Sequence, residues 1–480
     1  MNATTPSNIG DRPVCADCIG ESYLSIDIDR TGTPGECHYC GAEGQTVTIE
    51  MIANQVERAM KEHFERTPRD PEGYEYYIQR ETGDWDRSGE PVEDVIAQLL
   101  DADVAIAEDV RETLDDWTSD LDGIAAGEEQ PFDSEAHYQE TTSVDHSTIS
   151  AEYIRFESAI VDQARFFSPE SRRFLASLFE GLADLKAHNG RPVLVDAGPG
   201  KTTSSFFRAR VFQDDERLKG ALLAPASELS PPPRRTGRAG RLNAAGVSIF
   251  YGADTEEVAI AEVRPPVGSR VAMAQFELLR PVRLLDIDAL KSLLVEGSYF
   301  DPAHAARLQH AAFLRSFSWR FTQPVMPDHE AYEYIPTQAV ADFLANEVEP
   351  RLDGILYSSP QSASDARNVA LFHRSSRVEQ PADPEATRRD VWLGYHDDEG
   401  DVVDYTVMEQ MPAGTPSPPP QPPPLDDGFG FDPHLDPDSR PFTLRIKPDS
   451  LRVLHVNTVI VSYESFPVRT SRVHIRQEDF

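Results

Sequence analysis

The sequence has few cysteines, few basic residues and no long apolar run. Its 480 residues include 45 lysines and arginines against 82 aspartates and glutamates, a formal net charge of −37. Such a negative surface repels phosphate backbones, which argues against general binding to nucleic acids or anionic membranes. No segment approaches the roughly 18 consecutive apolar residues of a membrane helix, and the first residues lack a basic and an apolar signal region. We therefore expect a cytoplasmic protein.

The only cysteines are four, and all lie within the first 40 residues. They form two pairs, Cys15-x2-Cys18 and Cys37-x2-Cys40, with eighteen residues between the pairs. Each pair can present two thiolates from a tight turn, and two such turns close a tetrahedral four-sulfur site. The spacing predicts a structural zinc ion, because four sulfurs leave no open position for catalysis. Two disulfides or free thiols are the alternatives.

The length of the chain, and the change in residue composition and hydrophobic pattern along it, predict a multidomain α+β protein. A cysteine-bearing zinc knuckle over residues 1–45 precedes a helical bundle over 46–190, and an α+β domain follows over 192–375. Residues 376–440 suggest a loosely structured insertion and a proline-rich linker. Residues 441–480 predict strands that return to the α+β domain.

Helical segments are predicted where apolar residues recur every three or four positions. In the helical region these segments are residues 47–65, 91–117, 151–167 and 168–188, the last beginning at Ser168 and ending at Asn189-Gly190. In the α+β domain, short β-branched or aromatic runs alternate with helices predicted at residues 255–263, 302–317 and 337–348.

Three local patterns have plainer explanations than a functional site. Residues 101–130 carry eleven acidic residues and one arginine, which indicates a solvated helix face more readily than an interaction surface. DAGPGKTT (196–203) resembles a phosphate loop, but Val195 stands where its first glycine is needed. The PxxP spacing within 412–428 is typical of a spacer as much as of an SH3-domain ligand.

Clustered arginines are informative in so acidic a chain. The group of interest consists of Arg208, Arg210, Arg234, Arg235, Arg238 and Arg241. Arginine makes bidentate contacts with phosphate oxygens, so a dinucleotide could be held here. Tyr251 ends a predicted strand, and Asp254 with Glu257 predicts the start of a helix that carries Glu262. A short strand, turn and helix can bring Tyr251 and Glu262 to one cleft. The alternative is a basic loop with a structural Glu–Arg pair, for instance Glu262 with Arg264 or Arg208.

The order of these residues resembles the RES domain, the toxin half of Xre–RES toxin–antitoxin pairs. That family's pattern is an early Arg in a strand, then G-R-[WF]-N-x2-G, a Tyr before an A-x2-E helix, a G-I-x-Y-x-S stretch and an N-x3-F ending. The matching positions here are Arg208; Gly240, Arg241, Leu242, Asn243 and Gly246; Tyr251; Ala259 and Glu262; Gly354, Ile355, Tyr357 and Ser359; and Asn368 and Phe372. The resemblance covers about 192–375 and departs at Leu242, usually an aromatic, and in the long loop before Arg241.

This resemblance implies an ADP-ribosyltransferase-like fold and the degradation of NAD by hydrolysis or phosphorolysis. Nicotinamide leaves NAD as a neutral pyridine, so Glu262 would stabilise an oxocarbenium-like ribose and no general acid is needed. Tyr251 would orient the nicotinamide ribose or stack on its ring, and Ser359 would bind substrate or fix Glu262.

The same resemblance implies a binding set for NAD. Arg208 and Arg241 would grip the pyrophosphate or a nucleophilic phosphate, and Asn243 and Tyr251 belong to the same set. Inorganic phosphate is a possible second substrate under this interpretation. An antitoxin or regulatory protein is the expected partner, since a free NAD-degrading enzyme would poison its host.

The first 190 residues resemble, mainly by order, the HEPN-type module found ahead of RES domains, in which a cysteine knuckle precedes a helical bundle. Three alternative functions stay open. The chain could be an ADP-ribosyltransferase that modifies a macromolecule, a non-enzymatic binding protein built on the zinc knuckle, or a HEPN ribonuclease. The ribonuclease would use Arg58 and His63, five residues apart in one predicted helix, although chance placement on a helix surface is the plainer explanation.

Overall fold

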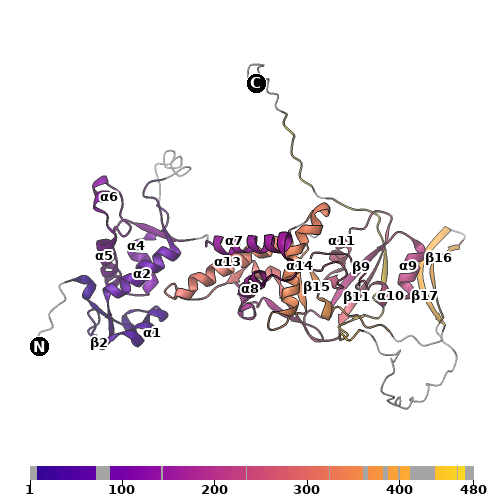
Figure 1. Cartoon of the computed structure of the whole chain (residues 1–480), viewed down its shortest axis with the longest axis horizontal. Helices are drawn as coiled ribbons and strands as arrows, with labels where there is room; N and C mark the ends of the chain where they lie inside the picture. Colours follow the sequence, from indigo (N-terminus) through magenta and orange to yellow (C-terminus); the bar gives the residue numbers. More distant parts are fainter. Residues whose placement is uncertain are drawn as a thin grey trace, which may run out of the picture. The chain divides into compact units, whose positions relative to one another are not determined.

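A computed structural model divides the chain into two compact units. The first comprises residues 1–192 and 289–320, and the second comprises residues 193–288 and 321–480 (Figure 1). The structure describes residues 8–71, 87–141, 144–233, 235–323, 325–359, 366–381, 388–397, 400–410, 438–461 and 463–470. The segment 289–320 was predicted within the α+β domain, but its contacts cluster with the first unit. The expected proline-rich linker at 412–428 lies outside the described residues.

The first unit begins with a small antiparallel sheet that carries the cysteines. Its strand order is β1-β3-β2, and its elements are β1 (Pro13–Cys15), α1 (Ser22–Thr31), β2 (Thr33–Glu36) and β3 (Glu43–Thr48). Helix α2 (Ile49–His63) follows without a break, because the Thr48 hydroxyl accepts a hydrogen bond from Met51 N and so caps its first turn.

The helices behind this sheet bury one apolar face each in a common core. They are α2, α4 (Val92–Leu100) and α5 (Val104–Thr118). The short α6 (Leu121–Ala126) follows α5 in the chain. The single helix predicted over 91–117 is wrong, because Asp101 adopts a left-handed backbone with φ 47° and ends α4. Asp103 then caps α5 by accepting from Ala105 N.

The rest of the first unit mixes strands and helices, so the region 46–190 is less helical than predicted. A second antiparallel sheet, in the order β4-β6-β5, contains β4 (Phe64–Arg66), β5 (Glu90–Pro91) and β6 (His137–Glu140). Helix α7 (Ser147–Ser158) passes into a π-helical turn (Ala159–Gln163), and α8 (Pro169–Leu178) ends well before the predicted Asn189-Gly190 stop. The ring of Tyr153 on α7 and that of Phe179, just after α8, contact rings on α13 (Pro302–Thr322). Strand β7 (Lys186–Ala187) pairs with β13 (Leu293–Leu294).

The second unit is organised by one large sheet in the order β18-β11-β9-β10-β15-β14-β12-β8, with β19 also pairing with β11. The β12–β14 pair is parallel, and the other described pairs are antiparallel. Its strands are β8 (Leu194–Ala197), β9 (Ser205–Phe212), β10 (Phe250–Ala253), β11 (Arg270–Leu278), β12 (Val282–Asp286), β14 (Gly354–Ser358), β15 (Arg367–Leu371), β18 (Leu444–Ile446) and β19 (Arg452–His455). The two last strands thus lie on β11, far from them in sequence.

Helices and one hairpin complete the second unit. The helices are α9 (Asp215–Leu223), α10 (Pro225–Glu228), α11 (Glu256–Glu262) and α14 (Glu330–Asn346), with α12 (Ile287–Leu290) at the end of β12. The insertion predicted to be loosely structured instead forms an antiparallel hairpin of β16 (Arg388–Asp397) and β17 (Gly400–Gln410). Its β-branched and aromatic residues explain this correction, since they favour extended pairing. Within the described residues, no helix is both long and apolar enough to cross a membrane.

Candidate active site and metal centre

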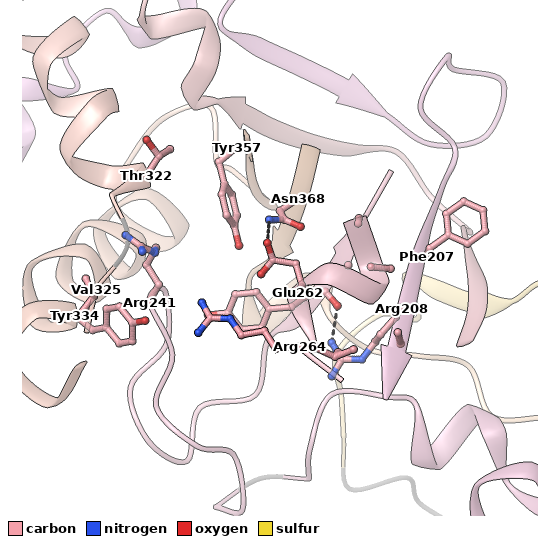
Figure 2. A pocket seen from close by; sticks show the side chains of 16 residues that line it. Phe207, Arg208, Arg241, Glu262, Arg264, Thr322, Val325, Tyr334, Tyr357 and Asn368 are labelled. Carbon is pink, nitrogen blue, oxygen red and sulfur yellow. Dashed lines mark hydrogen bonds between the residues drawn. The ribbon is translucent and has the colours of Figure 1, made fainter. Parts of the chain in front are cut away.

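A pocket of about 320 Å³ opens in the second unit (Figure 2). Four neighbouring strands of the sheet, β9, β10, β15 and β14, each contribute a side chain to it: Arg208, Tyr251, Asn368 and Tyr357. Helix α11 packs against β9, β10 and β15, and residues at the end of α13 and on α14 close the remaining side. The pocket therefore collects residues that are more than 150 positions apart in the chain.

Glu262 ends α11 and is held with its carboxylate at the pocket. Its Oε1 accepts hydrogen bonds from Ser359 Oγ at 2.6 Å and from Asn368 Nδ2 at 2.7 Å. Both donors are buried, whereas Glu262 itself is exposed. A carboxylate fixed through one oxygen and open to solvent is oriented for contact with a ligand. The helix begins one residue later than predicted, because Thr255 and not Asp254 caps it.

Asp254 does not cap α11 as predicted but binds Arg367 at the start of β15. Its carboxylate accepts from Arg367 N at 2.8 Å, and the Arg367 guanidinium lies 3.7 Å away. Arg367 also contacts the fully buried Asp286 at 3.2 Å. These bonds fix the start of β15 beside α11, and so they position Asn368 one residue further on.

Arg208 lines the pocket from β9 and is committed to the sheet. Its guanidinium donates to Tyr251 O at 2.6 Å and lies 5.2 Å from the centre of the Phe250 ring. Burial, followed by the nearby Arg210, lowers the pKa of Arg208 to about 10. No carboxylate among the described residues forms an ion pair with Arg208. Its positive charge therefore stays uncompensated at the wall of the pocket.

Tyr251 presents its ring to the pocket and uses its hydroxyl elsewhere. The hydroxyl donates to Asn243 Oδ1 at 2.9 Å and accepts from Leu242 N at 3.2 Å. Burial raises the pKa of Tyr251, while the Leu242 hydrogen bond and the nearby arginines oppose that rise. A side chain at Gly240 would place its Cβ only 2.9 Å from this hydroxyl, so the loop needs glycine there. Tyr251 thus anchors the loop that carries Arg241.

Asn243 lies behind the pocket and not in its lining. It is buried, and its Nδ2 donates to three backbone carbonyls, those of Arg238, Ala244 and Val247. Its amide nitrogen is thus engaged within its own loop, and the predicted contact of Asn243 with NAD stays a prediction. Asn243 reaches the pocket through Tyr251.

Arg241 does line the pocket, and its guanidinium donates to two backbone carbonyls. It donates to Phe321 O at 2.7 Å and to Gln323 O at 2.5 Å, close to the C-terminal end of α13. Its guanidinium also lies 5.5 Å from the centre of the Tyr334 ring. A positive side chain at a helix C-terminus stabilises the exposed carbonyls. The structure thus gives Arg241 a structural contact that the sequence did not predict.

The remaining arginines of the predicted cluster lie elsewhere. Arg210 forms an ion pair with Glu228 at 2.8 Å, and neither Arg235 nor Arg238 lines the pocket. Arg234 lies outside the described residues. Arg264, which the prediction used only as a possible structural partner of Glu262, does line it. The charged lining residues are therefore Arg208, Arg241, Arg264 and Glu262, an excess of positive charge within a strongly acidic chain.

Sequence reasoning missed several other residues at this site. Thr322 and Tyr334 line the pocket from α13 and α14, and no pattern in either helix distinguished them. Asn368 was noted only as part of the family pattern, although an amide inside the apolar run of β15 is an available signal, since buried polar groups need partners. Tyr357, also noted only as part of the family pattern, lines the pocket, and burial raises its pKa well above the usual value.

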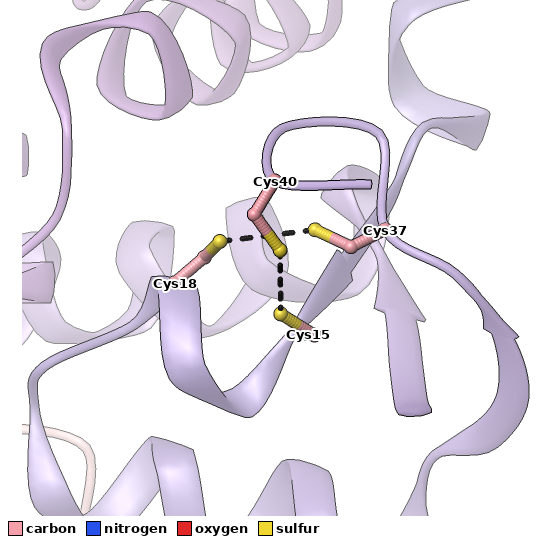
Figure 3. Close-up of side chains that lie close together, drawn as sticks. All are labelled: Cys15, Cys18, Cys37 and Cys40. Carbon is pink, nitrogen blue, oxygen red and sulfur yellow. Dashed lines mark hydrogen bonds between the residues drawn. The ribbon is translucent and has the colours of Figure 1, made fainter. Parts of the chain in front are cut away.

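The four cysteines form a compact cluster in the first unit (Figure 3). Cys15 Sγ lies 3.5 Å from Cys40 Sγ, and Cys18 Sγ lies 3.8 Å from Cys37 Sγ; all four sulfurs are within 4.8 Å of one another. No disulfide joins them, which argues against the alternative of two disulfides and leaves zinc or free thiols. Tetrahedral zinc with bonds of about 2.3 Å needs sulfur separations of about 3.8 Å, so this donor set could hold zinc.

Backbone groups prepare one of these sulfurs for a metal. Burial opposes ionisation of Cys37, but backbone N–H groups of Cys40, Tyr39 and Cys15 lower the pKa of Cys37 to about 7. Burial raises the pKa of Cys18 and of Cys15. A metal ion would therefore supply the positive charge that the other thiolates need.

Arg58 and His63, the pair of the ribonuclease alternative, lie inside the first unit. Arg58 donates to Gln55 Oε1 at 2.7 Å and to Phe300 O at 2.8 Å. His63 is buried, and its ring centre lies 4.8 Å from that of Tyr299. Burial lowers the pKa of His63, so it is not on the helix surface that the prediction assumed.

Comparison with known proteins identifies the middle of the chain. Residues 209–393 match the family model of the RES domain. No curated protein and no solved structure matches the chain. The match includes Arg241, Tyr251, Glu262 and Ser359, and it begins one residue after Arg208. The HEPN-type resemblance of the first 190 residues lies outside this match and stays a prediction.

Proposed function

We propose that the second unit cleaves the bond between nicotinamide and ribose in NAD, with water or inorganic phosphate as the acceptor. The observation that carries this proposal is Glu262, an accessible carboxylate held by Ser359 and Asn368 in a pocket whose other charged lining residues are arginines. The RES-domain match supports it at the level of the family. An ADP-ribosyltransferase-like fold is part of the same proposal.

The chemistry suits a lone carboxylate. When the bond between ribose C1′ and the pyridinium nitrogen breaks, its electron pair moves to the nitrogen and nicotinamide leaves as a neutral ring. The ribose left behind develops positive charge, which a negative side chain fixed nearby stabilises more strongly than the ground state. Glu262 supplies that charge, and the hydrogen bonds from Ser359 and Asn368 keep it in place. The acceptor then attacks C1′; a water loses its proton in this step.

The remaining lining residues suit the other parts of NAD. The pyrophosphate carries two negative charges, and the arginines of the pocket supply the opposite sign. Tyr251, Tyr334 and Tyr357 offer aromatic surfaces for a ring or a sugar. We propose that Ser359 acts by fixing Glu262 and that Tyr251 acts by its ring and through the Arg241 loop.

We propose zinc as the ion at Cys15, Cys18, Cys37 and Cys40. Four thiolates at tetrahedral separations are the donor set that zinc takes in structural sites. The site has no open position in such a geometry, so it stabilises the first unit and takes no part in the reaction.

The direct test incubates the purified chain with NAD, with and without inorganic phosphate, and identifies the products by mass spectrometry. The proposal predicts free nicotinamide together with ADP-ribose, or with ADP-ribose 1″-phosphate when phosphate is the acceptor. Labelled protein or nucleic acid, with little free ADP-ribose, would instead indicate transfer to a macromolecule. Intact NAD after prolonged incubation would refute the proposal and favour a non-enzymatic binding protein.

A further inference from the structure

We infer that Arg264 is the residue that binds a phosphate group of the substrate in the pocket of the second unit. This inference rests on the proposed function, and it moves the phosphate-binding role away from Arg208 and Arg241. The three arginines of the pocket differ in how far the protein already engages their guanidinium groups and in how exposed they are.

Arg208 and Arg241 are both engaged by backbone carbonyls. Arg208 donates to Tyr251 O at 2.6 Å, and Arg241 donates to Phe321 O and Gln323 O. Turning either guanidinium toward a ligand would break these hydrogen bonds, which costs free energy. These two side chains contribute charge to the pocket, but the protein itself holds each guanidinium in place, Arg208 through one hydrogen bond and Arg241 through two.

Arg264 differs from Arg208 and Arg241 in its exposure and in its hydrogen bonds. It is exposed, it lines the pocket, and no described residue accepts a hydrogen bond from its guanidinium. Figure 2 shows its side chain extending into the pocket on the side of Arg241 and Tyr334. The pKa of Tyr334 reflects this position: burial raises it most, and the charges of Arg241 and Arg264 oppose the rise. All five donors of Arg264 therefore remain available to a planar, bidentate acceptor such as a phosphate.

The backbone at Arg264 is also unusual. Its φ is 45°, in the left-handed region that non-glycine residues rarely adopt, and Pro265 follows, which normally favours an extended residue before it. Glycine would fit this position with less strain. A strained arginine two residues after Glu262 is consistent with selection for the side chain and not for the backbone.

The geometry gives a division of the pocket. Glu262 faces the ribose carbon that reacts, and Arg264, on the same short segment, holds the phosphate side of the substrate. Two phosphate groups could occupy this position: the pyrophosphate of NAD, or the inorganic phosphate that attacks the ribose. Both use the same oxygen acceptors, so only separate measurements with each ligand distinguish them.

The test measures binding of ADP-ribose and of inorganic phosphate to the full chain by isothermal titration calorimetry. The variants are Arg264→Gln, Arg264→Lys and Arg264→Gly, with Arg238→Gln as the matched control because Arg238 is exposed but does not line the pocket. We expect Arg264→Gln to raise the Kd of ADP-ribose, of phosphate, or of both by about 10- to 100-fold, with partial rescue by lysine. Arg264→Gly should show the same loss with an unchanged or higher Tm, which separates binding from folding.

The outcomes distinguish this inference from the proposed function. A change confined to ADP-ribose assigns Arg264 to the pyrophosphate, and a change confined to phosphate assigns it to the acceptor. If Arg264→Gln binds both ligands as the wild type does, or if the wild type binds neither, the inference is overturned. If binding depends on Arg264 but the wild type leaves NAD intact, the inference stands and the proposed function fails.

Discussion

The cysteine cluster of the first unit and the arginine pocket of the second are built on opposite principles. The cluster joins four identical ligands that lie at most 25 residues apart in the chain, and all four could bind one dication. The pocket joins different side chains from four strands and three helices, and its positive charge exceeds its negative charge. A site whose ligands fill the coordination shell of one ion stabilises a fold, whereas an open pocket with excess positive charge is suited to an anionic ligand.

The largest effect that would sharpen this contrast is loss of the metal. Replacing Cys37 with serine, or adding a strong chelator, should release one zinc ion per chain and unfold the small sheet of the first unit. Structural zinc contributes on the order of 10 kcal/mol in small zinc domains, more than this sheet can replace. Metal analysis with circular dichroism would measure both changes. Because the second unit has its own core, NAD cleavage should persist, and its parallel loss would break the comparison.

The next effect concerns the support of Glu262. Ser359→Ala and Asn368→Ala each remove one hydrogen bond to the carboxylate, and such bonds to a charged group are worth about 1.5–3 kcal/mol. We expect kcat to fall by about 10- to 100-fold in each variant, with a smaller change in KM, measured as nicotinamide release. Ser358→Ala, one residue before Ser359 on β14 and not part of the pocket lining, is the control. An unchanged kcat in both variants would mean that the carboxylate needs no fixing.

A smaller effect is expected for Asn243, which acts behind the pocket. Asn243→Ala leaves three backbone carbonyls without their amide donor, and we expect the free energy of unfolding to fall by about 1–3 kcal/mol. Urea denaturation would measure it. KM for NAD should rise as well, because the loop carries Arg241. A higher KM with wild-type stability would instead indicate that Asn243 touches the substrate directly.

The smallest effect is expected for Tyr251→Phe. It removes the hydroxyl that Asn243 and Leu242 share but keeps the ring that lines the pocket. The free energy of unfolding should fall by about 1 kcal/mol, and kcat should change little, as thermal unfolding and steady-state assays would show. A loss of kcat as large as that of the Asn368 variant would give the hydroxyl a direct role in the reaction.

The two sites also differ in how far the sequence predicts them. The spacing of the cysteines alone predicted that their sulfurs cluster, because a short turn has little freedom in where it places them. The four are Cys15, Cys18, Cys37 and Cys40. The pocket was predicted only in part. Ser359 was expected either to bind substrate or to fix Glu262, and it does donate a hydrogen bond to Glu262. The hydrogen bonds from Arg208 to Tyr251 O and from Arg241 to Phe321 O could not be predicted, because they depend on tertiary packing.

The fold shows the same division between local and distant determinants. Short β-branched runs and the caps at Thr48 and Ser168 define elements from nearby residues, and Ser168 does accept from Ser171 N at the start of α8. The break at Asp101 and the β16–β17 hairpin were missed, since a left-handed residue and a strand pairing outweighed the local pattern. The grouping of 289–320 with the first unit depends on contacts that the sequence does not display.

The central claim is that Glu262 makes the second unit an NAD-cleaving enzyme. The most direct measurement follows nicotinamide release from NAD by proton NMR for the wild-type chain and for Glu262→Gln at equal concentration. Glutamine keeps the size of the side chain and removes its charge, so the account predicts release by the wild type, a rate at least about 100-fold lower for the variant, and the same Tm. Equal rates for the two proteins would contradict it.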